Sequence, residues 1–287
     1  MKNTTVWKRF GLYSVILAAL GMFPACGPSQ SAASSAPGSG DLLSRVMASG
    51  KVVAAFNLAN APWEDKDPGT GNFVGMSVDL MQGFAKGIGV QVEFMPLEFG
   101  SLIPAIQAGK ADIICTNLSR TMARSTKVLY TEPIGGSPGV AIFMKGGKWT
   151  PATTLDQVNQ PGVILTTEAG TIHETMAKQK FPNAKMNAVN QNSDGMAALK
   201  AGRAHFFLSG KDVGDAMKSK DPSVDYLNQV VFADSFAYGV KLSPDSYTFV
   251  QAFNNYLKII KIDGTYGAIY QKYFHAPWVP NSIEIAN

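Results

Sequence analysis

Short apolar segments that alternate with amphipathic ones constrain the fold of this chain more than any other feature. Residues 52–57, 90–95 and 111–115 are apolar runs of strand length, and residues 78–89 and 99–109 between them have helical spacing. A β-α-β-α-β series of this kind predicts a mainly parallel sheet covered by helices.

The alternation continues through the second half of the chain. The chain closes with two predicted helices, 246–260 and 264–274, whose apolar residues fall on one face. Two α/β units in 287 residues imply two lobes, and a cleft between lobes is a common place for a ligand. The remaining strand candidates are 140–144, 163–167, 185–189, 205–209 and 229–233, and the helix candidates between them are 171–180, 192–203 and 213–220.

The first 25 residues have the pattern of an export signal. "MKNTTVWKRF" is basic, and the apolar stretch "FGLYSVILAALGMF" that follows is too short to span a bilayer comfortably. We therefore interpret residues 1–25 as a signal and not as an uncleaved anchor. Residues 26–40 are rich in Ser, Gly, Pro and Ala, so we expect a flexible tether there.

The segment "FPAC", residues 23–26, resembles a bacterial lipobox. On that interpretation Cys26 is the lipidated first residue of the mature protein, and ordinary cleavage nearby is the alternative. Either route places the protein in the periplasm or cell envelope. Cys115, the other cysteine, lies in an apolar segment and is expected to be buried and inert.

Charge and motifs exclude several classes of function. Of the 25 basic residues, three lie in the leader, so the remainder is nearly balanced against 21 acidic residues and predicts no nucleic-acid surface. The chain has no phosphate-binding loop, no nucleophile elbow and no zinc-ligand spacing. His173, His205 and His275 stand apart from any convincing pair of carboxylates. We therefore expect no metal, no cofactor and no catalytic residue.

The most informative polar residues follow the apolar run at 111–115. In "CTNLSRTMARS" the small side chains of Thr116, Asn117 and Ser119 precede Arg124. Short hydroxyls and amides make a poor core, whereas a guanidinium matches the two oxygens of a carboxylate. The stretch therefore predicts a site for a small anion.

The order of motifs resembles the amino-acid-binding group of periplasmic solute-binding proteins, family 3, the receptors of bacterial ABC importers. The resemblance covers residues 41–278 and implies an α/β fold of the periplasmic binding protein type II class, with two lobes joined by two hinge crossovers. Lobe 1 would comprise residues 41–137 and 235–287, and lobe 2 residues 138–234. Its landmarks are, in order, "NAPWED", "GNFVGMSVDLMQGFAKGIG", "LIPAIQAGKADII", "LSRTMARSTKVLYTEPI", "EAGT", "LKAGRAHFFL" and "IDGTYGAIYQKYF".

The resemblance assigns roles to residues of the first lobe. Arg124 matches the arginine that binds the α-carboxylate of the ligand. Thr116, Asn117 and Ser119 match the polar loop beneath that carboxylate, where short donors complete its shell.

Further ligand contacts are implied on both sides of the cleft. Gly170 and Thr171 stand at a predicted helix start in lobe 2, where free N–H groups make a second anion contact. Trp63 and Phe99 fall where relatives place aromatic residues against the ligand side chain, although either could instead belong to the core. Asn60 would line the same wall.

One position departs from the family pattern. After the strand candidate at 205–209, relatives usually carry an Asp that pairs with the ligand's ammonium, and this chain has Gly210. A buried ammonium without a carboxylate partner is costly. Three explanations stay open: Asp212 reaches in, another acid such as Glu64 or Glu168 serves, or the ligand lacks an α-amino group. The predicted ligand class is therefore amino acids and related small carboxylates.

Three functions compete at this point. The favoured one is a monomeric exported receptor that closes around one small carboxylate and delivers it to an ABC permease. The alternative is a periplasmic enzyme on the same fold, of the cyclohexadienyl or arogenate dehydratase type, with Glu168 and His173 as its only candidate groups. A tethered regulatory or adhesive protein is the third.

Overall fold

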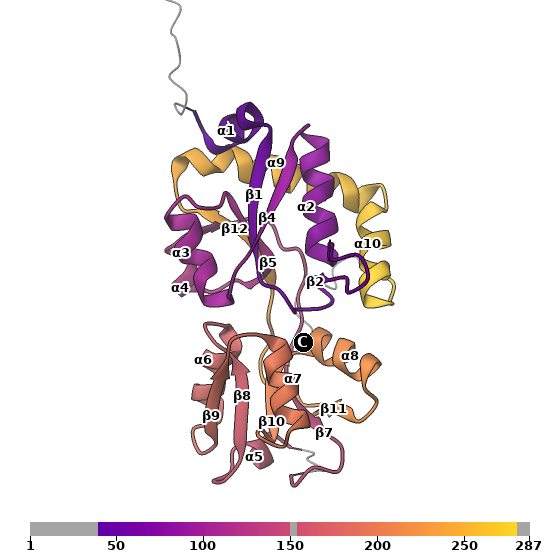
Figure 1. The fold of residues 1–287 in the computed structure, drawn as a ribbon. Coiled ribbons are helices and arrows are strands. Elements are labelled where there is room, and N and C mark those ends of the chain that lie inside the picture. Colours follow the sequence, from indigo (N-terminus) through magenta and orange to yellow (C-terminus); the bar gives the residue numbers. More distant parts are fainter. Residues whose placement is uncertain (1–39, 150–153, 280–287) are drawn as a thin grey trace, which may run out of the picture. The chain divides into compact units, whose positions relative to one another are not determined.

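Two five-stranded sheets and a two-stranded ribbon, with helices packed around them, make up the part of the chain that the structure describes (Figure 1). This computed structural model describes residues 40–149 and 154–279. The predicted export signal at 1–25, the lipidation site Cys26 and the predicted tether up to residue 39 lie outside them. No helix within the two described ranges is both long and apolar enough to cross a bilayer.

The first sheet has the strand order β4-β1-β5-β12-β6. β1 (Lys51–Phe56) pairs in parallel with both β4 (Gln91–Pro96) and β5 (Ile113–Ser119). β12 (Phe236–Lys241) lies antiparallel between β5 and β6 (Val128–Tyr130). The three strands predicted before residue 116 are confirmed as neighbours in one parallel group.

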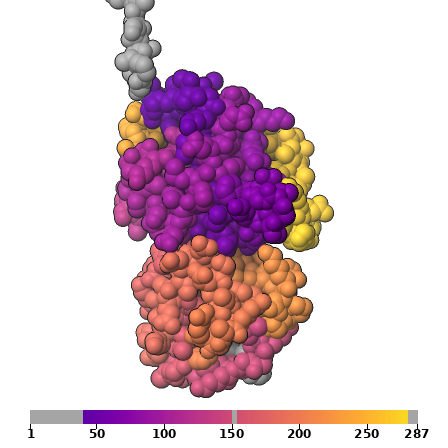
Figure 2. Space-filling model, viewed as in Figure 1, coloured from indigo at the N-terminus to yellow at the C-terminus, as the bar shows by residue number. Residues whose placement is uncertain are grey.

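Helices from both ends of the described chain cover the first sheet. α1 (Leu42–Ser49), α2 (Met76–Gly87) and α3 (Leu102–Gln107) come from its beginning, and α9 (Tyr247–Ile262) and α10 (Thr265–Phe274) from its end. α1 contacts α9, and α2 contacts α10. Figure 2 shows the result on the surface, where yellow C-terminal segments adjoin indigo and purple N-terminal ones. The first sheet is therefore completed only after the chain has built the second one.

Local sequence explains how these helices begin and pack. Asp41 caps α1, since its side chain accepts a hydrogen bond from Ser44 N at 2.8 Å. Pro104 is tolerated because it falls in the first turn of α3, where its missing N–H needs no partner. Phe84 of α2 and Phe253 of α9 meet edge to face with ring centroids 4.9 Å apart, which joins the two helices in the core.

The second sheet has the strand order β11-β7-β10-β8-β9. β8 (Ile164–Glu168) pairs in parallel with β9 (Lys185–Val189) and β10 (Phe206–Gly210). β7 (Gly139–Met144) lies antiparallel between β10 and β11 (Val224–Tyr226). Each sheet thus has three mutually parallel strands, followed by two strands that each pair antiparallel with the strand before them in the sheet order.

Four helices belong to the second sheet: α5 (Leu155–Val158), α6 (Ile172–Lys180), α7 (Asn192–Lys200) and α8 (Lys211–Lys220). α6 follows β8 after a three-residue turn, and α8 follows β10 directly. The starts of these two helices therefore lie at the carboxyl ends of parallel strands, which is where α/β sheets commonly bind ligands.

The chain passes between the sheets twice, so the predicted two-lobed α/β fold with two crossovers is confirmed. The outgoing connection links β6 to β7, and the return links β11 to β12. The two connections run beside each other, with single bridges between Gly135 and Phe236 and between Gly139 and Phe232.

The strand predicted at 229–233 is wrong. This apolar run belongs to the return crossover, where Phe232 makes a single bridge and no ladder forms. Its backbone bonds only to Gly139, whose N–H donates to Phe232 O at 2.9 Å and whose carbonyl accepts from Val231 N at 2.8 Å. The apolar residues of this run predicted a strand, but Val231 is buried within the crossover and does not belong to a sheet.

Candidate functional site

A small central cavity is lined by residues from both sheets. Its volume is about 20 Å³, which is room for about one water molecule. Six of the predicted site residues line it: Asn60, Phe99, Asn117, Ser119, Thr171 and Gly210.

Alternation along β5 separates its three polar residues. Successive side chains of a strand point to opposite faces, so Asn117 and Ser119 share a face and both line the cavity. Thr116 is fully buried and donates from Oγ1 to Oε2 of Glu64 at 2.8 Å. The structure thus brings two of the three to the cavity, while Thr116 supports the wall from behind.

Arg124 does not itself line the cavity, but it contacts residues that do. It lies on α4 (Met122–Ser125), and its Cζ is 5.1 Å from the centroid of the Phe99 ring. Nη1 donates to Ser119 O and Nη2 to Gly170 O, both at 3.0 Å. Burial lowers the pKa of Arg124 somewhat, yet a guanidinium stays charged at any physiological pH. The guanidinium is therefore a fixed cation that joins β5 to the start of α6.

The start of α6 is closed by its own side chains. Thr171 Oγ1 accepts from Glu174 N at 3.3 Å and donates to Glu168 O at 2.7 Å. Gly170 N donates to Glu174 Oε2 at 2.8 Å. Gly170 has φ 75° and lies so close to Gly100 that a Cβ would be 3.1 Å from its Cα. Two of the N–H groups expected to meet an anion are therefore bonded within the chain.

A chain of amides crosses the cavity from one sheet to the other. Asn60 Nδ2 contacts Glu64 Oε2 and Asn117 Oδ1, both at 2.8 Å. Asn60 Oδ1 accepts from Asn192 Nδ2 at 2.9 Å, and Ser209 Oγ lies 3.4 Å from Asn192 Oδ1. These bonds connect the segment after β1 with α7 and β10 on the second sheet.

Trp63 is not brought to the cavity. Its indole is 1% exposed and packs edge to face on Phe236 and Phe274, with centroid distances of 5.5 and 5.2 Å. Phe236 lines the cavity at this point, as Phe99 does elsewhere, so Trp63 lies one layer behind Phe236. The indole Nε1 donates to Oδ2 of Asp212.

Glu168 is the acid that lines the central cavity. It is 4% exposed, and burial raises its pKa to about 7. Its Oε1 accepts from Asn57 Nδ2 at 2.8 Å, a bond between the end of β1 and the end of β8. Glu64 lies behind the wall, and burial raises its pKa to about 8.

Asp212 fills the space that a side chain at residue 210 would occupy. A Cβ built on Gly210 would lie 2.2 Å from Oδ1 of Asp212. This Oδ1 is buried and has no hydrogen-bond partner among the described residues, while Ser137 Oγ accepts from Asp212 N at 3.1 Å. Burial raises the pKa of Asp212. The carboxylate missing at position 210 is therefore replaced in space by one two residues later.

His173 is a neutral hydrogen-bonding group on the cavity wall. Burial, with the nearby charge of Arg124, lowers the pKa of His173 to about 3. Its Nε2 is buried and unpaired among the described residues. Across residues 40–149 and 154–279 no group of His, Cys, Asp and Glu is arranged to hold a metal ion.

Six lining residues were absent from the predicted ligand-binding residues. Glu168 and His173 were considered only as alternative groups, and four others were not considered. Ser209 directly precedes Gly210, and Asn192 is the first residue of α7, so their positions at element ends were a usable signal. Val213 and Phe236 are apolar and carried no signal beyond core formation. The four complete the wall: Asn192, Ser209, Val213 and Phe236.

The sequence profile of the bacterial extracellular solute-binding proteins, family 3, matches residues 52–276. The chain belongs to this family.

Curated relatives of this solute-binding protein are named as binding proteins. ABC transporter arginine-binding protein 1 of Escherichia coli K12 is 26% identical over 204 residues, covering 70% of this chain and 82% of the relative. The histidine-binding periplasmic protein of the same strain is 26% identical over 256 residues, covering 81% and 95%.

Solved structures share the two-lobed fold. An ancestral amino-acid-binding protein, described as a precursor of cyclohexadienyl dehydratase, matches the solute-binding protein with a TM-score of 0.75 and 27% identity, over 81% of this chain and 99% of that one. An ancestral arginine-binding protein bound to arginine has a TM-score of 0.71 and 26% identity, over 78% and 98%.

Proposed function

We propose that this solute-binding protein captures an amino acid in the central cavity and delivers it to the permease of an ABC importer. The observation that carries the proposal is the convergence of polar residues from both sheets on one enclosed cavity. Relatives named for binding arginine and histidine support the ligand class. The two proposed lobes are residues 41–137 with 235–287, and residues 138–234.

Capture requires the proposed lobes to move apart. A cavity of about 20 Å³ cannot hold an amino acid, so the described conformation is closed. Side-chain hydrogen bonds link the lobes around it, among them Asn60 to Asn192, Asn57 to Glu168, and Trp63 to Asp212. Bending at the paired crossovers would open the site, and a ligand that touches both lobes would favour closure again.

The α-carboxylate of the ligand would bind Arg124. Both η nitrogens now donate to neutral backbone carbonyls, those of Ser119 and Gly170. A carboxylate accepts stronger, charge-assisted hydrogen bonds, so it would replace these carbonyls when the site opens. Phe99 holds the guanidinium from its face and keeps it oriented.

The α-ammonium would bind Asp212. Its Oδ1 is a buried acceptor without a partner beside Gly210, a residue of the cavity wall. An ammonium there would satisfy that oxygen and offset the cost of burying it. In this arrangement Asp212 replaces the Asp that relatives carry at position 210, so the ligand can have a free α-amino group.

The ligand side chain would be cationic, because Glu168 is an acid on the cavity wall in addition to Asp212 behind Gly210. When both acids are ionised, Arg124, Asp212 and Glu168 together carry one positive and two negative charges. A basic amino acid carries one carboxylate and two cations, which is the complementary set. A bound cation would favour the ionised form of Glu168.

We also propose that the protein binds without chemical change and acts in the periplasm. Dehydration needs an acid poised over a substrate. His173 is held neutral, so Glu168, whose pKa is about 7, is the acid of the cavity wall that such chemistry would have to use. Incubation with arogenate or prephenate should return each compound intact by mass spectrometry. Mass spectrometry of the membrane fraction should find Cys26 lipidated, and a mature chain that begins elsewhere would exclude the anchor.

The binding proposal is tested by calorimetry of the purified protein against the common amino acids and small organic acids. At least one basic amino acid should bind tightly, and the function is excluded if no member of this panel binds. Arg124→Ala should weaken that binding about 100-fold or more, since a buried charge pair is lost. Arg120→Ala, an exposed arginine four residues earlier, is the matched control and should bind normally.

A further inference from the structure

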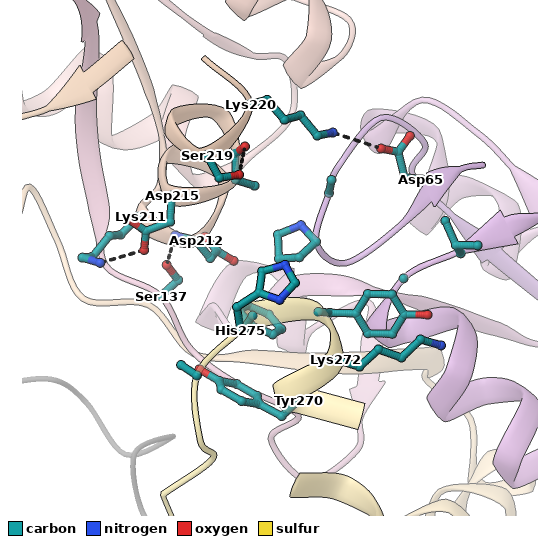
Figure 3. Close-up of a pocket in the computed structure, with 18 of the residues that line it drawn as sticks. Asp65, Ser137, Lys211, Asp212, Asp215, Ser219, Lys220, Tyr270, Lys272 and His275 are labelled. Carbon is teal, nitrogen blue, oxygen red and sulfur yellow. Dashed lines mark hydrogen bonds and ion pairs between the residues drawn. The ribbon is translucent and has the colours of Figure 1, made fainter. Parts of the chain in front are cut away.

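A second and much larger cavity lies beside the outgoing crossover (Figure 3). Its volume is about 640 Å³, within the range of small-molecule sites. It is walled by residues 61–65, the crossover residues 136–138, α8, and residues 270–276 at the end of α10. We call it the lysine-lined cavity, after Lys211, Lys220 and Lys272.

One wall of the lysine-lined cavity is aromatic. Tyr270 and Phe274 of α10 stack with their ring centroids 4.4 Å apart and an interplanar angle of 8°. Tyr273 lines the same cavity, and Figure 3 shows His275 with its ring directed into the cavity. Such a wall offers ring faces and edges to a flat aromatic molecule.

The opposite wall carries the least engaged of the three lysines. Lys211 is 2.7 Å from Asp215, and Lys272 is 2.7 Å from Asp79, both within hydrogen-bond distance. Lys220 is 70% exposed and lies 3.7 Å from Asp65, too far for a hydrogen bond. Figure 3 places Lys220 across the cavity from Tyr270. An anionic group that reached Lys220 would gain a bond which Asp65 does not make.

The partners of the other two lysines leave Lys220 as the lysine that an anion can engage. Lys211 pairs with Asp215, and Lys272 pairs with Asp79, which does not line the cavity. The third acid of the lining, Asp212, is nearly buried and bonded to the Trp63 indole. Of the three lysines, Lys220 is therefore the one whose nearest carboxylate lies beyond hydrogen-bond distance.

We propose that the lysine-lined cavity is a second small-molecule site, which takes an aromatic carboxylate. The ring lies against Tyr270 and Phe274, and the carboxylate bonds to Lys220. Arg124, Asn117 and Ser119 of the proposed amino-acid site do not line it, and Asp212, which does, is the one assigned residue that lies between the two sites.

The probe for this site is 4-fluorobenzoate, followed by ¹⁹F NMR on the purified protein. The ¹⁹F resonance of 4-fluorobenzoate should broaden when the protein is added, because the probe binds. The resonance of 4-fluorobenzylamine, which has the same ring and the opposite charge, should not broaden. Lys220→Gln should weaken 4-fluorobenzoate binding about 5-fold or more. Lys218→Gln is the matched control, since Lys218 lies on the same helix but pairs with Asp225 outside the cavity.

Two further variants decide between sites. Ala216→Trp places a large side chain in the lysine-lined cavity from α8 and should abolish binding of 4-fluorobenzoate. If this variant does not fold, Lys220→Gln tests the same site, because Lys220 is exposed and its substitution does not disturb the fold. Arg124→Ala should leave 4-fluorobenzoate binding unchanged. The proposal is overturned if 4-fluorobenzoate does not bind, if Lys218→Gln and Lys220→Gln act equally, or if Arg124→Ala abolishes the signal. None of these results bears on whether an amino acid binds the central cavity.

Discussion

The central cavity and the lysine-lined cavity handle polar groups in opposite ways. The first has about 20 Å³ of space, and its wall consists largely of buried amides, hydroxyls and acids that bond to one another. The second has about 640 Å³, and its charges sit on exposed lysines and aspartates that pair at its rim. A ligand of the first must replace existing bonds, whereas a ligand of the second only adds to what is there.

This difference predicts that the central cavity is the more selective of the two sites. A buried polar group left unpaired costs about 1–3 kcal/mol, so a wrong ligand in the central cavity is penalised at each unmatched group. An exposed ion pair contributes roughly 0.2–1 kcal/mol, so the lysine-lined cavity discriminates weakly. Volume therefore does not identify the more specific site.

After Arg124→Ala, the largest effect is expected from Asp212→Asn. The amide keeps the shape and the bond from Trp63 but removes the charge that we assign to the ligand ammonium. Loss of one partner of a buried charge pair should weaken amino-acid binding by about 30-fold or more in calorimetry. Asp215→Asn, on the same helix and exposed, is the control. Equal effects of the two variants would remove Asp212 from the central site.

The buried acids Glu64 and Glu168 should make the free energy of unfolding depend on pH. Burial raises the pKa of Glu64 to about 8 and that of Glu168 to about 7, above the values near 4.5 of the unfolded chain. Between pH 5 and 7 both folded acids hold protons that the unfolded chain has released, and Glu64 does so up to about pH 8. Asp234, whose pKa burial raises to about 7, acts in the same direction, whereas His173, kept neutral by burial, opposes it below about pH 6.5. The free energy of unfolding should fall as pH rises, by up to about 1.4 kcal/mol per pH unit for each group.

Denaturant titrations between pH 5 and 8 measure this slope, and Glu64→Gln should flatten it. Glu174→Gln is the control, because Lys178 and the Gly170 N–H lower the pKa of Glu174 and so move its titration below this window. A ligand-free protein whose stability rises across the window would contradict the buried acids as described.

A smaller effect is expected from Glu168→Gln. The change keeps an acceptor for Asn57 but removes the negative charge that faces the ligand side chain. We expect the preference for arginine over glutamine, measured as a ratio of dissociation constants, to fall about 10-fold. An unchanged ratio would assign the side-chain end of the ligand to other residues.

The smallest effect is expected at the rim of the lysine-lined cavity. Lys272→Gln removes an exposed pair with Asp79, whose side chains are 59% and 24% exposed. The free energy of unfolding should change by less than about 1 kcal/mol. A larger loss would show that this rim resembles the central cavity more than its exposure indicates.

Local patterns predicted one half of the site better than the other. Asn117, Ser119 and Arg124 lie within eight residues, so one strand and one turn place them together. The bond between Asn60 and Asn192 joins residues 132 positions apart, and no local pattern reports such a pairing. Thr116 is an intermediate case, since alternation along β5 already separates it from its two neighbours.

The fold was predictable for the same reason. Strands and helices follow from periodicity over a few residues, and most of the predicted elements are present. The run at 229–233 failed because it is a crossover in which only Val231 is buried, and composition does not distinguish such a segment from a strand. The lysine-lined cavity was beyond prediction, since it exists only where α8 and the end of α10, about 50 residues apart, come together.

The bonds from Arg124 to Ser119 O and Gly170 O give the protein a built-in competitor for its own ligand. An incoming group must replace Ser119 O, which belongs to the same proposed lobe as Arg124. It must also compensate for Gly170 O, which bonds to Arg124 only in the closed form. An amide or ester in place of the carboxylate offers an acceptor of similar strength and gains almost nothing from the exchange. Amino-acid amides should therefore be excluded by the closed protein itself, before any clash with the wall is needed.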